Sequence, residues 1–278
     1  MRLAVMSDVH ANEHALNIVL NDAKSKSVDK YVFLGDYITD GGASNKILEV
    51  IRNIGDYVII GNREKYIISY DNKRDEFNNS KTLKYVFDEL TNENFEYIKS
   101  LEDNMTFVFD ETKFLITHGD EFWTSENEIF IFFDKLIAKY DFDICFFGHI
   151  HLYLDTIYKG KRFICPGSVG QSVDSPTYKY CIMSIDSHFK NELCEIAVSD
   201  TFERFKNEYM ESEFYNLNKI WGELIIKSVQ DGVDYIRKFM AIVNERTNDD
   251  MNASEYNRIY EKVYKEYMSN NFRQKNLH

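Results

Sequence analysis

The sequence contains little proline and glycine and shows no cysteine pattern. Two Pro and twelve Gly among 278 residues argue against a disordered or low-complexity chain. An apolar fraction of 44% is enough to bury one substantial core. No two of the four Cys have the C-x-x-C spacing that zinc-binding and redox motifs use. We expect buried, reduced thiols without a disulfide framework.

Long apolar runs and an excess of positive charge are also missing. No segment approaches the ~20 apolar residues that a membrane span needs, and the first six residues are too few for a signal peptide. We therefore expect a cytoplasmic protein with no membrane partner. The net charge of −13 disfavours nucleic acid as a partner, because such a surface would be basic. A small anionic substrate stays compatible, since bound cations reverse the local field.

The first two-thirds of the chain alternates strand-like apolar runs with helical patterns. Strands are expected at 3–6, 31–34, 57–60, 105–109, 114–117, 144–147, 154–158, 161–164, 178–185 and 192–198. The early β-α-β-α-β order predicts an α/β core with right-handed crossovers. Hairpins come later in the chain, so we expect two packed mixed sheets with helices outside. The segment 65–104 is polar and mainly helical, and it is expected to form a cap or an excursion beside the site.

The pattern changes after about residue 200. We divide the chain into a domain over 1–200 and a helical C-terminal subdomain over 201–278. An apolar stripe at helical spacing comprises Tyr256, Ile259, Tyr260, Val263, Tyr264 and Tyr267. The first interpretation is that this stripe packs on the core. A homodimer interface through the C-terminal helices is the alternative.

Polar residues directly follow five of the expected strands. The clusters are Asp8-Val9-His10, Gly35-Asp36, Gly61-Asn62-Arg63-Glu64, His118-Gly119-Asp120 and Gly148-His149-Ile150-His151. Ligands of open α/β sheets bind outside the carboxyl ends of the strands, and imidazole with carboxylate suits Zn, Mn and Fe. Taken singly, each residue has an ordinary explanation, such as a helix cap for Asp8 or a core position for His118. Taken together, the five clusters predict one metal site. His14 lies outside these clusters and is expected on a helix surface or behind the site.

The ordered clusters resemble the calcineurin-like metallophosphoesterase superfamily, whose pattern is D-x-H, G-D, G-N-H-[DE], H-G and G-H-x-H. The chain matches every letter but one over residues 3–198. It looks closest to small bacterial phosphodiesterases and diadenosine-tetraphosphatase-like members. The resemblance implies a four-layer α/β/β/α sandwich, extended here by C-terminal helices, and a site for two divalent or transition-metal ions, Mn, Fe or Zn.

The resemblance also assigns ligands by position. One metal would take Asp8, His10, Asp36 and His151, and the other would take Asp36, Asn62, His118 and His149. Asp36 would bridge the two ions. A hydroxide between them would be the nucleophile, because metal coordination lowers the pKa of water.

Arg63 is the first departure from the superfamily, since many relatives carry His there as the proton donor to the leaving group. Arginine does not deprotonate in proteins. Arg63 is open to three interpretations: a bidentate phosphate clamp, which we favour, a structural partner of Glu64, or a sign of impaired catalysis. Asp40 is a second departure, because protein phosphatases of the superfamily carry a phosphate-binding Arg there.

These residues predict a metal-dependent phosphohydrolase that cleaves a phosphodiester or a nucleotide phosphoanhydride. Asp36, Asn62 and Arg63 are the expected catalytic residues, and the substrate is a small phosphorylated compound or nucleotide. Without a protein acid, good leaving groups are favoured over alkyl monoesters. The alternatives are a phosphomonoesterase or phosphoprotein phosphatase, and an inactive metal-bearing scaffold.

Overall fold

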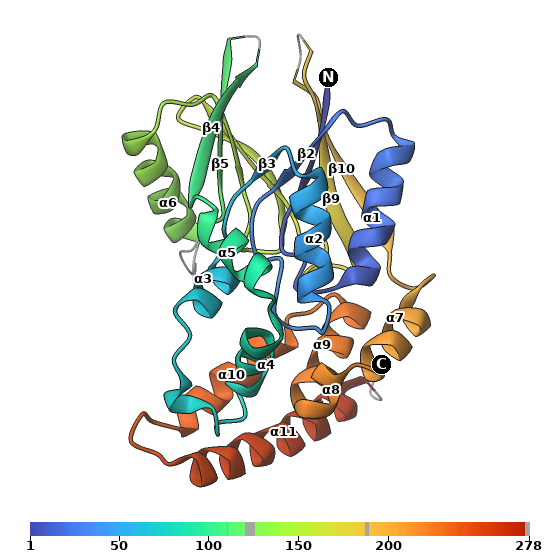
Figure 1. The fold of residues 1–278 in the computed structure, drawn as a ribbon, viewed down its shortest axis with the longest axis vertical. Coiled ribbons are helices and arrows are strands. Elements are labelled where there is room, and N and C mark those ends of the chain that lie inside the picture. Colours follow the sequence, from blue (N-terminus) through green and yellow to red (C-terminus); the bar gives the residue numbers. More distant parts are fainter. Residues whose placement is uncertain (110, 120–125, 187–188, 276–278) are drawn as a thin grey trace.

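The computed structural model describes residues 1–109, 111–119, 126–186 and 189–275 (Figure 1). Its first sheet has the strand order β10-β9-β1-β2-β3. The strands are β1 (Arg2–Met6), β2 (Lys30–Phe33), β3 (Tyr57–Val58), β9 (Thr177–Ser184) and β10 (Asn191–Ala197). β1, β2 and β3 are parallel. β9 pairs antiparallel with β1, and β10 pairs antiparallel with β9 at the edge of the sheet.

The second sheet repeats this plan with the order β4-β5-β6-β8-β7. The strands are β4 (Asn104–Phe109), β5 (Thr112–Thr117), β6 (Ile144–Phe147), β7 (Tyr153–Tyr158) and β8 (Lys161–Pro166). β5, β6 and β8 are parallel, whereas β4 and β7 pair antiparallel at the two edges. The β4–β5 and β7–β8 pairs are the two hairpins that the sequence predicted.

Strand alternation places each sheet between two apolar layers. Leu3 and Val5 of β1 point toward the other sheet, where they join Phe114 of β5 in the central core. Ala4 and Met6 point to the opposite face and join the core beneath the helices. Successive side chains of a strand face opposite sides, so four consecutive residues supply both layers.

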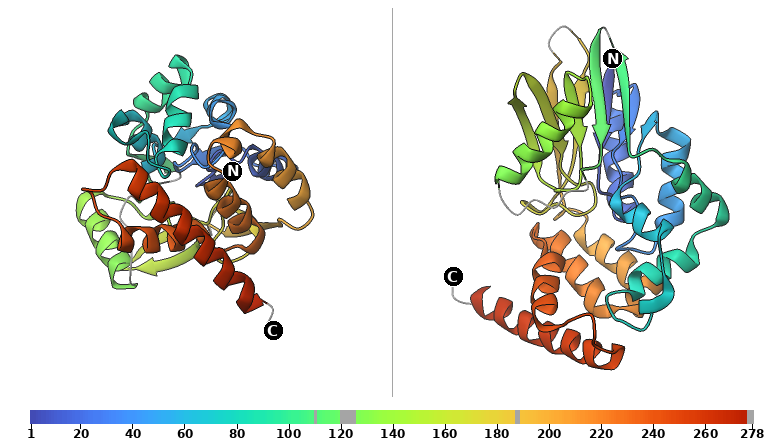
Figure 2. Two further views of the ribbon diagram at one scale, coloured as in Figure 1. Left: turned by 90° about the horizontal axis from the view of Figure 1, so that it is seen from below. Right: turned by 90° about the vertical axis from the view of Figure 1, so that its left-hand side faces the viewer.

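Helices complete the sandwich on its two outer faces (Figure 2). α1 (Glu13–Ser25) and α2 (Ser44–Ile54) pack on the first sheet, and α6 (Glu126–Lys139) packs on the second. Asn12 caps α1, because its side-chain oxygen accepts a hydrogen bond from the amide of Ala15 at 3.0 Å. The α/β/β/α layering predicted from the sequence is therefore confirmed.

The segment between β3 and β4 is helical, as expected. It contains α3 (Asn62–Ile68), a 3-10 helix at Asn72–Arg74, α4 (Lys81–Glu89) and α5 (Asn92–Ser100). β3 is two residues shorter than predicted, because Ile59 leaves the strand and forms an isolated bridge with Glu102.

Five helices follow the last strand and lie below the sandwich in Figure 1. They are α7 (Phe202–Met210), α8 (Glu213–Leu217), α9 (Lys219–Asp231), α10 (Tyr235–Arg246) and α11 (Ala253–Lys275). The predicted stripe lies on α11, and its Tyr256, Tyr260 and Val263 are buried in a cluster with Leu224 of α9 and Phe239 of α10. The stripe therefore packs mainly on neighbouring helices, not on the sheets. The domain boundary at residue 200 and the homodimer stay predictions.

Two expectations drawn from composition can be compared with the described residues. The four cysteines lie in β6, β8, β9 and β10, and all four are buried and free. Across the described ranges, no helix combines the length and the apolar composition that crossing a membrane requires.

Candidate metal centre

The predicted ligands all follow the carboxyl ends of parallel strands. Asp8 and His10 follow β1, and Asp36 follows β2. Asn62 begins α3 after β3, His118 follows β5, and the His149 and His151 loop follows β6. Since parallel strands direct their carboxyl ends to one edge, both sheets deliver these side chains to the end that faces the C-terminal helices (Figure 1). Asp120 lies outside the described residues.

The side chains converge in two groups, each suited to hold a metal ion. One group is Asp8, His10 and His151, and the other is Asp36, His118 and His149. Within each group, one ligand atom per residue lies within 4.8 Å of the others. The carboxamide oxygen of Asn62 belongs with the second group, because it lies 3.0 Å from Nε2 of His118 and 2.8 Å from Nδ1 of His149.

Asp36 stands between the two groups. Its Oδ1 lies 3.3 Å from Nε2 of His118, and its Oδ2 lies 3.9 Å from Nε2 of His10. One carboxylate oxygen therefore faces each group. This is the placement that a bridging carboxylate needs in a two-metal site.

The hydrogen bonds of the histidines fit metal ligation. Nδ1 of His118 lies 2.7 Å from the carbonyl of Leu34, and Nδ1 of His151 lies 2.7 Å from the carbonyl of Gln171. A carbonyl accepts a hydrogen bond from Nδ1–H, which leaves Nε2 as the nitrogen directed at the centre. The buried Oδ1 of Asp8 makes no hydrogen bond among the described residues and faces Nε2 of His151 at 3.2 Å and Nε2 of His10 at 3.8 Å. Buried polar atoms of this kind call for a partner, and a divalent cation at this position would supply it.

Backbone strain concentrates on the same residues. φ is positive for Asp8, His10, Asp36, His149 and His151, with values from 50° to 72°. Non-glycine residues rarely adopt this left-handed region, and such strain gathers at functional sites where the surrounding structure maintains it. The loops are shaped to direct side chains inward at a cost in backbone energy.

Close contacts with Asp36 leave no space for a side chain at Gly61. A Cβ on Gly61 would lie 2.3 Å from both the amide nitrogen and Oδ1 of Asp36. Glu64 holds this region together, since its buried carboxylate accepts hydrogen bonds from the amides of Gly61, Asp36 and Tyr37 at 2.8 to 3.0 Å. Burial and the nearby charge of Asp36 raise the pKa of Glu64 to about 7.

The buried ionisable groups of the centre have shifted pKa values. Burial disfavours the imidazolium of His118, but the carboxylates of Asp36 and Asp8 outweigh it and raise the pKa of His118 to about 10. Burial and the neighbouring imidazolium of His118 lower the pKa of His149 to about 4. Burial opposes the ionisation of Asp8, yet His151 holds its pKa at about 2. In the metal-free protein, protons on histidine balance buried carboxylates, and cations would take over this role.

Arg63 does not pair with Glu64, so that interpretation was wrong. Its Nη2 lies 3.4 Å from Asp40 and its Nε lies 3.8 Å from Asp36, while Glu64 is engaged by backbone amides. Arg63 keeps 26% of its side chain exposed. It lines the cleft beside Asn62, where a phosphate-binding cation is expected.

Sequence reasoning missed a linking role of Asp40. Its Oδ2 lies 3.1 Å from Nδ1 of His10, and its Oδ1 accepts a hydrogen bond from the indole of Trp221 at 2.9 Å. The hydroxyl of Tyr209 donates to its carbonyl at 2.7 Å. One carboxylate thus joins a predicted metal ligand, Arg63 and the C-terminal helices. The only signal in the sequence was the departure from the superfamily pattern at this position.

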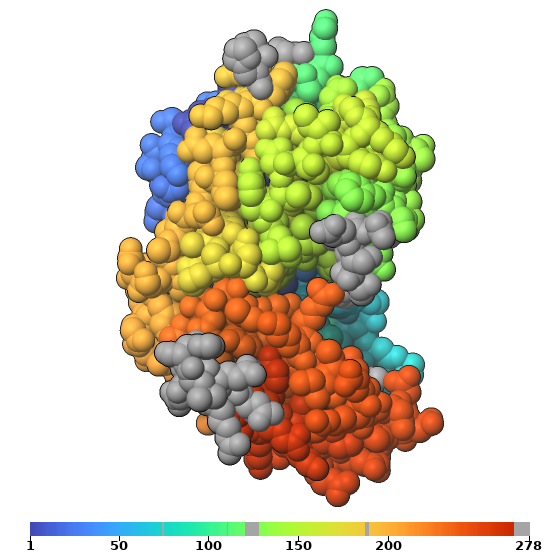
Figure 3. Space-filling model, turned by 180° about the vertical axis from the view of Figure 1, so that it is seen from behind, coloured from blue at the N-terminus to red at the C-terminus, as the bar shows by residue number. Residues whose placement is uncertain are grey.

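A cleft opens over the candidate metal centre. It has a volume of about 1030 Å³ and is lined by metal-site residues on one side and by α9 and α10 on the other. Figure 3 shows an indentation between the C-terminal helices, in orange, and the loops of the sandwich, in yellow and green. The C-terminal helices therefore form a wall of the site, which the sequence did not predict.

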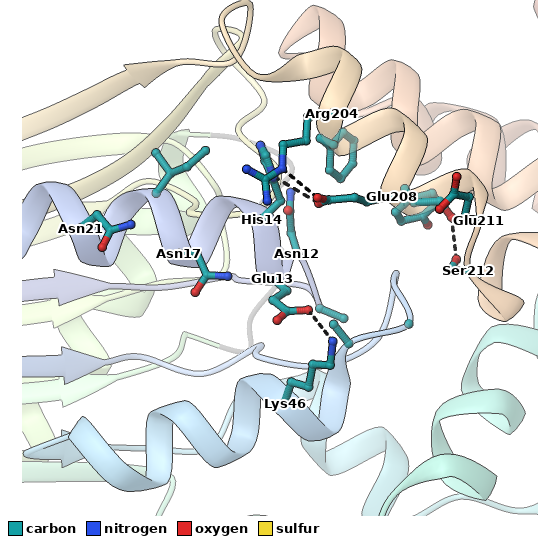
Figure 4. A pocket seen from close by; sticks show the side chains of 16 residues that line it. Asn12, Glu13, His14, Asn17, Asn21, Lys46, Arg204, Glu208, Glu211 and Ser212 are labelled. Carbon is teal, nitrogen blue, oxygen red and sulfur yellow. Dashed lines mark hydrogen bonds and ion pairs between the residues drawn. The ribbon is translucent and has the colours of Figure 1, made fainter.

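A second hollow of about 650 Å³ lies between α1, α2 and α7, and none of the predicted ligands lines it (Figure 4). His14 contributes to it, with Nδ1 of its imidazole 3.3 Å from the carboxylate of Glu208. The His14 side chain is only 7% exposed. Phe205 and Glu208 of α7 contact His14 and cover much of this face of α1, and the role of His14 stays a prediction.

Comparison with known proteins agrees with the fold. Residues 1–188 match the model of the calcineurin-like phosphoesterase superfamily domain. The chain therefore belongs to this superfamily, as the ordered motifs indicated.

Individual relatives extend beyond that segment. The chain is 28% identical over 219 residues to the uncharacterized protein MJ0912 of Methanocaldococcus jannaschii, covering 70% of this chain and 86% of the relative. The fold of the present chain is similar to that of a metallophosphoesterase from Sphaerobacter thermophilus, with a TM-score of 0.65 and 24% identity. The match covers 84% of this chain and 99% of that structure. Hypothetical protein PH1004 from Pyrococcus horikoshii is also similar, with a TM-score of 0.63, 18% identity, and coverage of 83% and 98%.

Proposed function

We propose that the protein is a dinuclear metal-dependent phosphohydrolase acting on a phosphodiester or a nucleotide phosphoanhydride. The position of Asp36 between two histidine-containing groups carries the proposal. Asp8, His10, Asp36 and His151 would hold one ion, and Asp36, Asn62, His118 and His149 would hold the other. When bound, divalent Mn, Fe or Zn would polarise the phosphoryl group and lower the pKa of the attacking water.

The residues of the chain act by orientation and charge. Arg63 lines the cleft as a fixed cation and stabilises negative charge on the phosphoryl oxygens. The amide of Asn62 adds a neutral polar contact beside it. Arg63 cannot protonate a leaving group, and this supports substrates whose leaving group departs as an anion. Diesters with acidic alcohols and phosphoanhydrides meet that condition.

The compartment is a further part of the proposal. Four buried, free cysteines suit the reducing cytoplasm. A small phosphorylated molecule is the proposed partner, in keeping with a cleft of about 1030 Å³.

The test measures hydrolysis by protein reconstituted separately with Mn, Fe and Zn. The substrates are bis-p-nitrophenyl phosphate, p-nitrophenyl phosphate and diadenosine tetraphosphate. We expect metal-dependent turnover of the diester or the anhydride, and its loss in Asp36→Asn. Asp155→Asn is the matched control, because Asp155 pairs with Arg162 outside the cleft.

Each alternative has its own outcome. Preference for the monoester would support a phosphomonoesterase or phosphoprotein phosphatase. Metal binding without turnover of any substrate would support a scaffold. Equal turnover by wild type and Asp36→Asn would refute the site.

A further inference from the structure

Apolar side chains line the cleft together with the metal-site residues. Val233, Ile236 and Met240 line it from the C-terminal wall, and Ile150 and Leu152 line it from the loop that carries His149 and His151. Leu152 leaves 40% of its surface exposed. Apolar side chains that face a polar centre across one cleft are the usual lining of a small-molecule site.

An aromatic side chain adjoins the expected phosphate position. Tyr66 lies one helical turn beyond Arg63 on α3, lines the same cleft and is 41% exposed. An exposed tyrosine ring offers a flat face on which another aromatic ring can stack. A group linked to a phosphate beside Arg63 would lie within reach of this ring.

The wall carries charges of both signs. Asp234, Arg237 and Lys238 line the same part of the cleft, so carboxylate and cations are mixed there. Mixed charge at the rim of an apolar surface suits a neutral group with polar edges.

We propose that Tyr66 and the α10 wall form a subsite for a nucleobase attached through its sugar to the reacting phosphate. The inference rests on the proposed function and deepens it, because it names nucleoside phosphodiesters as the substrate class. The volume of about 1030 Å³ far exceeds the needs of a phosphate alone.

The experiment measures binding to the full-length, Mn-loaded protein by calorimetry, with adenosine 5′-monophosphate and ribose 5-phosphate. These ligands differ at C1′, where the nucleotide carries the base and ribose 5-phosphate carries a hydroxyl. Stacking and burial of a base predict that the nucleotide binds on the order of tenfold to a hundredfold more tightly. Equal affinities would overturn the subsite.

Variants assign the effect to the wall. Tyr66→Ala and Met240→Ser are expected to bring the affinity ratio toward one. Met210→Ser is the matched control, since Met210 is 40% exposed and does not line the cleft, and it should keep the wild-type ratio. Thermal melts verify folding, and the exposed Tyr66 keeps the test decisive should Met240→Ser not fold. A wild-type ratio in Tyr66→Ala would refute the assignment.

Failure of the two proposals can be distinguished. If the enzyme turns over substrate but binds both ligands equally, the subsite is wrong and the proposed function stands. If no substrate is turned over while the base still strengthens binding through Tyr66, the subsite stands without the hydrolase.

Discussion

Replacing Trp221 by Phe tests the link between the C-terminal helices and the metal centre. Trp221 is 7% exposed, and its indole donates to Asp40, which is 3% exposed. Losing a hydrogen bond to a buried charge costs about 1.5–3 kcal/mol. The smaller ring also removes roughly 40 Å³, which at ~24 cal/mol per Å³ costs about 1 kcal/mol. We expect a loss of about 2.5–4 kcal/mol in the free energy of unfolding.

Urea denaturation of the metal-free protein measures this loss, and a double-mutant cycle with Asp40→Asn isolates the contact. Coupling of about 1 kcal/mol or more is expected between the two positions. Phe239→Leu is the control, because this fully buried residue lies in the cluster formed with α11. It should destabilise the protein without coupling to Asp40. A Trp221→Phe loss below about 1 kcal/mol, or no coupling, would refute the argument.

Asp40 also contacts His10 and Arg63, so Asp40→Asn should affect activity as well. Residues that orient metal ligands typically change metal affinity or activity by about 10- to 100-fold. We expect a drop of about tenfold in kcat/KM for the diester at saturating Mn. Unchanged kcat/KM would mean that Asp40 positions neither residue.

Three further predictions concern the centre itself. Arg63→His should raise the monoester-to-diester ratio of kcat/KM, because imidazole can protonate a leaving group, and an unchanged ratio would contradict this. With its pKa raised to about 10, His118 is charged at pH 7.5, so Mn binding should release about one proton and strengthen as pH rises. Calorimetry in buffers of different ionisation enthalpy measures the proton release. Mn binding without proton release would contradict the prediction. Gly61→Ala should weaken Mn binding roughly tenfold or more by displacing Asp36, whereas Gly42→Ala, whose Cβ has 3.4 Å of clearance, should not.

The fold was predictable because its signals are local. Short apolar runs such as 3–6 and 144–147 alternate with helical patterns, and the structure has strands at both places. β3 was overestimated, because Ile59 leaves the sheet for a bridge with Glu102 that the local sequence does not encode.

The convergence of the candidate ligands was predictable for the same reason. Each ligand directly follows a strand, and parallel strands bring their carboxyl ends together. Asp8 and His149 are 141 positions apart, yet the amide of His149 donates to Asp8 at 3.0 Å. What the motifs could not state is the set of supporting contacts. The carbonyl of Gln171 that holds His151 leaves no trace in a residue pattern, because every residue has a carbonyl.

By itself, the sequence determined the superfamily, the layered sandwich and the identity of the candidate ligands, since these depend on residue types next to strands. Only the tertiary structure decided that Arg63 pairs with Asp40, that Trp221 joins that carboxylate, and that α10 forms the far wall of the cleft. These contacts connect segments up to 181 positions apart. They depend on how amphipathic helices dock against loops, and helical periodicity specifies a buried face without specifying what covers it.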